Sequence, residues 1–166
     1  MKIKTILLYF ALRLSITFLI FSILVRWAYA VEVYELQGNI TWQHALEIRE
    51  LTDNSTLVLN SAGGNSLYMQ DIIKSVRNKN LNVICKDYCA SAAALIYLSS
   101  NKHEGQKSAT LAFHAPGRNL SGGQRIGNFS SQYQEFYRSL GVDKLMTKYQ
   151  WDMMWEDAQS IIEIRI

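Results

Sequence analysis

Cysteine, histidine and proline are scarce in this sequence. Its 166 residues include two Cys, three His and one Pro. Two cysteines are too few for a Cys₄ zinc site or for a disulfide-dense scaffold. One Pro and nine Gly exclude a collagen-like or low-complexity chain. With 49% hydrophobic and 19% charged residues, the composition is that of a chain that folds, and its length predicts one domain together with a targeting segment.

The body of the chain also lacks an excess of basic charge. The formal net charge is +3, from 17 Lys and Arg against 14 Asp and Glu. Four of the basic residues precede residue 31, namely Lys2, Lys4, Arg13 and Arg26. Thirteen basic residues then remain against fourteen acidic ones, a balance of −1. Because a nucleic-acid-binding surface needs a basic stripe, we expect no nucleic-acid partner.

The first thirty residues predict a secretory signal. A basic start is followed by an apolar stretch at 14–25 and by an Ala-x-Ala ending at Ala30. The alternative is an uncleaved membrane anchor, because residues 6–25 are long enough to span a bilayer. Arg13 disfavours the anchor, since its insertion at the centre costs about 2.5–3.5 kcal/mol. Both interpretations export the body, to the periplasm, to the outside of the cell or to the outer side of the inner membrane, where disulfides are permitted.

Residues 31–166 alternate between strand and helix signals, which predicts a single α/β domain with a mostly parallel sheet. Period-two alternation or short apolar runs predict strands, helical spacing predicts helices, and Gly-rich stretches predict turns and loops. The expected strands are 31–36, 56–59, 81–84 and 109–113, the expected helices are 41–51, 69–76, 90–98 and 126–140, and the expected turn and loop are 38–39 and 117–127. In the helix 41–51, we expect Trp42, Ala45 and Leu46 to face inward.

Three features at predicted strand ends carry chemistry. Residues 60–64 end in Gly63 and Gly64, whose backbone N–H groups can face a ligand or an oxyanion. Ser91 sits between alanines at the start of a helix, as a nucleophile on a tight strand-to-helix turn requires. His114 directly follows a strand, whereas His44 and His103 are expected at the surface. Taken singly, each has a simpler interpretation: a tight turn, a helix N-cap and a structural histidine.

Together, these features resemble a known family. The order Asn-Ser-x-Gly-Gly (60–64), Ala-Ser between small residues (89–92) and Phe-His-Ala-Pro (113–116) resembles the ClpP-type serine peptidases of the ClpP/crotonase superfamily, especially the short exported ClpP-like proteins of bacteria. The resemblance covers residues 31–163 and implies a ClpP/crotonase-like fold. It also implies hydrolysis of a peptide or protein substrate without metal or cofactor, and a fold that commonly forms homo-oligomers.

The resemblance also implies roles for individual residues. Ser91 matches the nucleophile and His114 the general base. The oxyanion hole matches Gly64, with Gly63 beside it, and the N–H of Ala92. Asp152 matches the acid, with Asp157 as the alternative, because the stretch 152–158 has the family's pattern of a hydrophobic pair before an acidic residue and Ala.

The sequence departs from the family at three positions: Ala93 replaces a Gly, Ala62 replaces a common Pro, and a Gly is missing at 160–161. These departures keep open a non-catalytic module of the same fold that binds a peptide or a partner protein. A crotonase-like acyl-thioester enzyme is disfavoured by the pairing of Ser91 with His114 and by export.

The two cysteines are four residues apart, at a strand end just before Ser91. In an oxidising compartment, this spacing predicts a disulfide between Cys85 and Cys89 that clamps the turn of Ser91. The alternative is two unrelated thiols, one of them buried.

Overall fold

The computed structural model describes residues 13–19, 31–119, 125–127 and 130–166, which fall into two units, Met1–Val31 and Glu32–Ile166. In the first unit, residues 13–19 form a helix. None of the helices in the described part of the chain is long and apolar enough to cross a bilayer. Most of the apolar stretch, and Ala30, lie outside the described residues, so the choice between signal and anchor stays a prediction.

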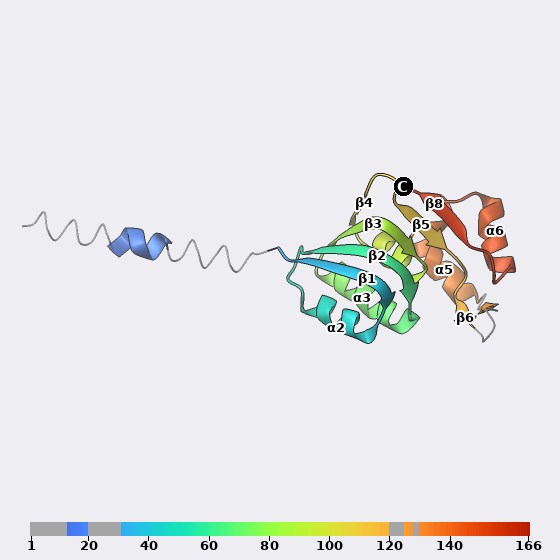
Figure 1. Cartoon of the computed structure of the whole chain (residues 1–166), viewed down its shortest axis with the longest axis horizontal. Coiled ribbons are helices and arrows are strands. Elements are labelled where there is room, and N and C mark those ends of the chain that lie inside the picture. The colour runs from blue at the N-terminus through green and yellow to red at the C-terminus, as the bar shows by residue number, and fades with distance from the viewer. Residues whose placement is uncertain (1–12, 20–30, 120–124, 128–129) are drawn as a thin grey trace, which may run out of the picture. The chain divides into compact units, whose positions relative to one another are not determined.

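The second unit is built on a six-stranded sheet with the order β1-β2-β3-β5-β8, in which β4 also pairs with β3 (Figure 1). The pairings among the first five strands are parallel, and β8 runs antiparallel to β5. The expected α/β fold with a mostly parallel sheet is therefore confirmed. The strands are β1 (Val33–Ile40), β2 (Thr56–Gly64), β3 (Asn82–Ala90), β4 (Lys102–Gly105), β5 (Thr110–Phe113) and β8 (Ile162–Arg165).

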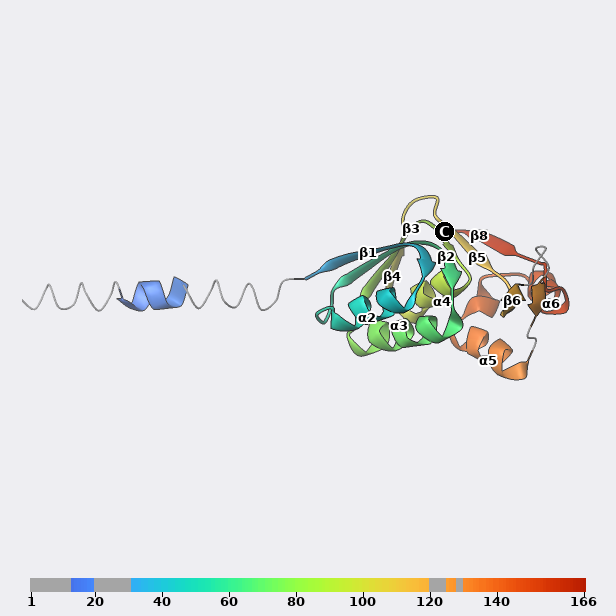
Figure 2. The ribbon, with the colours of Figure 1, turned by 60° about the horizontal axis from the view of Figure 1, so that its bottom comes forward.

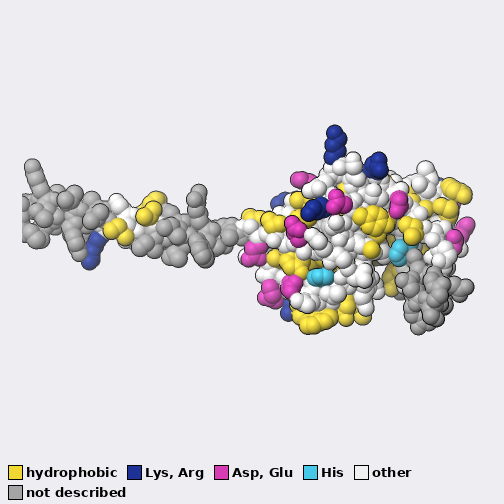
Figure 3. Space-filling view, in the orientation of Figure 1, with side chains coloured by type: hydrophobic (Ala, Val, Ile, Leu, Met, Phe, Trp, Pro, Cys, Tyr) yellow, Lys and Arg dark blue, Asp and Glu magenta, His cyan; other side chains and the backbone are white. Residues whose placement is uncertain are grey.

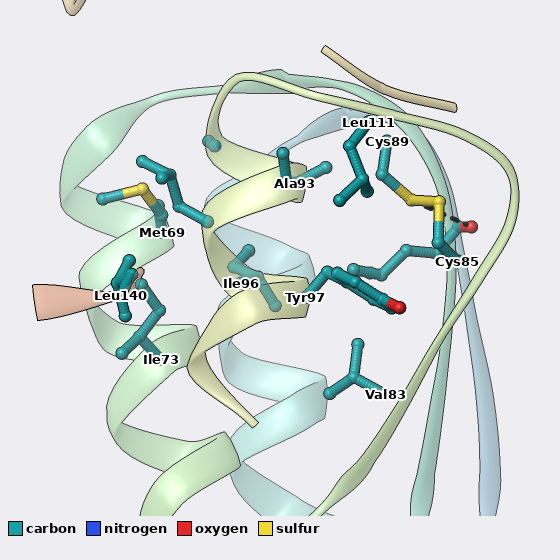
Figure 4. Close-up of a cluster of buried hydrophobic side chains, with 14 of the residues drawn as sticks. Met69, Ile73, Val83, Cys85, Cys89, Ala93, Ile96, Tyr97, Leu111 and Leu140 are labelled. Carbon is teal, nitrogen blue, oxygen red and sulfur yellow. Dashed lines mark hydrogen bonds between the residues drawn. A yellow bond between two sulfur atoms is a disulfide. The ribbon is translucent and has the colours of Figure 1, made fainter. Parts of the chain in front are cut away.

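Three helices cover one side of this sheet: α2 (Trp42–Glu50), α3 (Ser66–Asn78) and α4 (Ala92–Ser99) (Figure 2). Apolar residues lie on every side of α4, and such a helix must be buried. Its Ala93 and Ile96 lie at the centre of the hydrophobic cluster, between Met69 of α3 and Leu111 of β5 (Figure 4). The burial of α4 thereby fixes its first residue, Ala92, close to the end of β3, where the candidate site lies.

The C-terminal third forms a smaller layer beside the sheet. A two-stranded antiparallel sheet, β6 (Gly117–Asn119) and β7 (Arg125–Gly127), precedes α5 (Ser131–Ser139), a 3₁₀ turn η1 (Val142–Lys144) and α6 (Lys148–Glu156). An aromatic cluster joins the two helices, because the ring of Trp155 lies 5.3 Å from that of Tyr137 and 5.7 Å from that of Trp151.

Several local predictions were wrong. Residues 38–39 are not a turn, since they lie inside β1, where the register with β2 shifts and the left-handed Gly38 (φ +75°) absorbs the irregularity. The predicted loop 117–127 contains β6 and β7, and the predicted helix 126–140 begins only at Ser131. Ile126 belongs to β7, and Phe129 lies outside the described residues.

The inward face of α2 was predicted correctly only in part, because Ala45 packs against the core as expected but the other two residues do not. Trp42 and Leu46 are 59% and 39% exposed, whereas Ile48 is fully buried. A capping box between Thr41 and His44 starts the helix, and Ile48 is the residue of α2 that is buried in the core. On the face shown in Figure 3, hydrophobic, acidic and basic side chains are interspersed.

Candidate active site

Strand β3 has a pronounced bulge just before Ser91. Leu59 of β2 pairs with Cys85 and Ser61 pairs with Cys89, so two residues of β2 span four of β3. The Cα atoms of Cys85 and Cys89 are 6.1 Å apart, and the structure joins the two residues by a disulfide. Along a regular strand, four residues span about 13 Å at about 3.3 Å each. The disulfide therefore closes the base of the bulge, and both cysteines are fully buried.

The bulge also marks a change of neighbour. Before it, Asn82–Cys85 pair with β4, and after it, Tyr88–Ala90 pair with β5. Asp87 in the bulge accepts a hydrogen bond from the side-chain amide of Asn60 at 3.1 Å. Burial, followed by the nearby Glu163 carboxylate, raises the pKa of Tyr88. Through its pairing with β5, the end of β3 is held against the strand that leads to His114.

Ser91 occupies a strained turn between β3 and α4. Its backbone has φ 55° and ψ −121°, a conformation that non-glycine residues rarely adopt. Its N–H donates a hydrogen bond to the carbonyl of Ala112 at 2.8 Å, and its side chain makes no capping hydrogen bond to the helix. The following Ala92 and Ala93 are 4% and 0% exposed, which leaves no space for larger side chains. Strain of this kind is concentrated at functional sites, where surrounding packing maintains it.

Of the two glycines that end β2, Gly63 packs directly on this turn, whereas Gly64 packs against Ile40 of β1. Gly63 has φ +99°, and a Cβ added to it would lie 2.8 Å from the Ala90 carbonyl oxygen and 2.8 Å from Ser91 Cβ. Its N–H donates to Ser61 Oγ at 3.0 Å, so this amide is already engaged. Gly64 is exposed beside it, and Ala92 is the first residue of α4, where helix N–H groups have no partner within the helix. Of the three predicted oxyanion residues, Gly63 is thus the one that lets β2 approach the Ser91 turn closely.

His114 leaves the sheet at the same edge as Ser91. Ala90 of β3 pairs with Ala112 of the parallel strand β5. Ser91 follows one residue after the first, and His114 follows two residues after the second. The His114 Nδ1 lies 2.8 Å from the Ala115 carbonyl oxygen. Because a carbonyl oxygen only accepts hydrogen bonds, Nδ1 carries the proton, and in the neutral ring Nε2 is then the nitrogen that accepts.

Tyr137 of α5 contacts the backbone of His114. Its hydroxyl donates a hydrogen bond to the His114 carbonyl at 3.0 Å, and its side chain is 2% exposed. Tyr137 lies within the helix predicted over 126–140, but its contact with His114 was not predicted. Nothing in the sequence signals which backbone carbonyl a buried tyrosine hydroxyl will reach.

The predicted acid is not joined to the histidine. Asp152 is half-buried on α6, and its carboxylate forms no hydrogen bond or ion pair within the described part of the chain. The alternative, Asp157, is exposed and accepts hydrogen bonds from the Gln159 N–H and from Ser160 Oγ, both at 2.9 Å. These contacts organise the turn after α6. Ser91 Oγ likewise forms no hydrogen bond to His114 among the residues described.

Comparison with known proteins supports the fold. No protein-family profile and no curated protein sequence matches the chain. Among solved structures, the chain is similar to a point mutant of ClpP1 from Listeria monocytogenes, with a TM-score of 0.56 and 16% sequence identity. The match covers 81% of this chain and 83% of that one. The fold is therefore ClpP-like, and at this identity the likeness extends to the fold alone.

Proposed function

We propose that this protein is an exported serine hydrolase that cleaves peptide bonds, with Ser91 as nucleophile and His114 as general base. The observation that carries the proposal is the strained turn of Ser91. It holds a half-buried serine at the N-terminus of a buried helix, against Gly63 of β2 on one side and the strand leading to His114 on the other. Tight strand-to-helix turns of this kind present nucleophilic serines in other hydrolases.

The proposed mechanism is acyl transfer. His114 Nε2 accepts the proton of Ser91 Oγ as this oxygen attacks the substrate carbonyl, and later returns it to the leaving amine. The N–H groups of Gly64 and Ala92 stabilise the oxyanion of the tetrahedral intermediate. In other enzymes, losing one such donor costs about 2.7–4 kcal/mol. The resemblance assigns Asp152 as the acid that accepts the Nδ1–H of His114, and the structure has the Ala115 carbonyl in contact with that nitrogen.

Export and self-association are parts of the same proposal. A disulfide between two fully buried cysteines supports an oxidising compartment, because such bonds are rare in the cytosol. We expect a peptide or protein substrate outside the cytoplasm, and a homo-oligomer that sedimentation of the purified domain can detect.

A fluorophosphonate probe tests the chemistry, because it labels only an activated serine. We expect labelling at Ser91, its loss in Ser91→Ala, and a nearly equal loss in His114→Ala, because such residues act as a unit. Ser131→Ala is the control, since it removes an exposed serine hydroxyl from the first turn of a different helix. An unlabelled wild-type protein with a native circular dichroism spectrum would rule out the hydrolase.

The second candidate is a non-catalytic module that binds a peptide. Two observations favour it: the carboxylate of Asp152, which has no partner among the described residues, and an open pocket of about 720 Å³ between α3 and α5. Ile73, Tyr133 and Phe136 give the pocket an apolar lining. Under this alternative, Ser91→Ala retains biological activity in a complementation assay and Phe136→Ser loses it. The hydrolase proposal expects Ser91→Ala to be inactive.

A further inference from the structure

The segment that carries His114 is fixed from two directions. From α5, the buried hydroxyl of Tyr137 donates to the His114 carbonyl at 3.0 Å. The Tyr137 ring packs edge-on against Trp155 of α6 at 5.3 Å, so both helices hold the tyrosine in place. A hydrogen bond from a side chain that is 2% exposed sets the orientation of the His114–Ala115 peptide group.

The next peptide group completes the arrangement. Ala115 is fully buried, and its carbonyl accepts the hydrogen bond from His114 Nδ1 at 2.8 Å. Because Pro116 follows, the backbone of Ala115 is restricted to extended conformations, which limits where this carbonyl can point. The acceptor of the Nδ1 proton is therefore a fixed part of the histidine's own loop.

We propose that the Ala115 carbonyl, held in place by Tyr137, orients the His114 ring in the role that a carboxylate has in a Ser-His-Asp triad. The hydrogen bond a histidine makes through one ring nitrogen determines which tautomer is present. Here it keeps the proton on Nδ1, so that Nε2 can accept the proton of Ser91. Tyr137 is thus a positioning residue, and Asp152 is not needed for orientation. This inference rests on the proposed hydrolase function.

The tautomer of His114 is a readout that does not depend on activity. We would label histidine with ¹⁵N and record long-range ¹H–¹⁵N correlations at a pH where His114 is neutral, for the wild type, Tyr137→Phe and Asp152→Asn. Tyr97→Phe is the matched control, because it removes the hydroxyl of another buried tyrosine, 5% exposed, on a different helix. The rate of fluorophosphonate labelling is measured on the same four proteins.

We expect wild-type His114 in the Nδ1–H tautomer, and a larger Nε2–H fraction in Tyr137→Phe. Labelling of Tyr137→Phe should slow by about two- to tenfold, the equivalent of one hydrogen bond. Asp152→Asn should keep the Nδ1–H tautomer, and Tyr97→Phe should behave as the wild type in both measurements.

Two results overturn the inference: an Nε2–H tautomer in the wild type, or a loss of labelling in Asp152→Asn as complete as in His114→Ala. The second result would assign the orienting role to the carboxylate. If the tautomer is as expected but no protein is labelled, the hydrolase proposal fails while the orientation of His114 by Ala115 stands.

Discussion

Replacing Gly63 by Ala tests whether the end of β2 and the Ser91 turn are packed as tightly as the structure indicates. Two separate costs are expected. The positive φ of +99° disfavours any residue with a Cβ, by about 1–2 kcal/mol. The added Cβ would also lie 2.8 Å from the Ala90 oxygen and 3.0 Å from the Ala92 nitrogen, both of them backbone atoms. Overpacking of this kind costs about 1–3 kcal/mol, so the free energy of unfolding should fall by about 2–5 kcal/mol in total.

Gly141→Ala separates the two costs. Gly141 has a similar φ of +77°, but a Cβ there would have no neighbour within 4 Å. Urea denaturation of this variant should therefore show only the conformational cost, about 1–2 kcal/mol. Gly63→Ala should also reduce labelling of Ser91, because the clash displaces that residue, whereas Gly141→Ala should not. Equal stability losses in the two variants would refute the close packing of Gly63 on Ser91.

Two further predictions concern the bulge and the N-terminus. Reduction of the Cys85–Cys89 disulfide, which closes a loop of five residues, should lower the free energy of unfolding by about 2 kcal/mol. In urea denaturation with and without reductant, the Cys85→Ala/Cys89→Ala variant should be insensitive to reductant, and an intact mass showing two free thiols in the native protein would contradict the bridge. Export with cleavage after Ala30 should leave Val31 as the mature N-terminus in terminal sequencing, and an intact Met1 on the exported protein would indicate an anchor instead.

The fold was predictable where one sequence pattern determined one element. The apolar run at 57–59 forms a buried strand, and the apolar stretch after Ser91 forms the central helix α4. The short edge strands β4 and β8 were missed because polar or charged residues interrupt them, and pairing with a neighbouring strand, rather than local propensity, makes them strands. The helix α6 begins with a capping box between Thr147 and Gln150, a signal that the sequence itself carries.

For the candidate site, the sequence predicted which residues lie at the ends of the strands, but not the contacts between them. Small residues around Ser91, the paired glycines and the strand before His114 are local signals, and parallel strands bring their carboxyl ends to one edge. The contacts that fix the histidine are different in kind. The Tyr137 hydroxyl donates to the carbonyl of His114, which lies 23 residues away in the sequence. The Ala115 carbonyl belongs to the backbone, which every residue has. The residue types therefore predict neither contact.

The change of partner along β3 has a consequence for local opening. All four residues of β4 are exposed, and β4 pairs with β3 only up to Cys85. Beyond the bulge, the partner is β5, whose Leu111 and Phe113 are fully buried. Edge segments with few buried contacts open at low free energy, whereas core strands exchange their amide hydrogens only on global unfolding. Amide exchange in β4 can therefore proceed while the end of β3 that leads into Ser91 stays protected, with the disulfide at the boundary between the two.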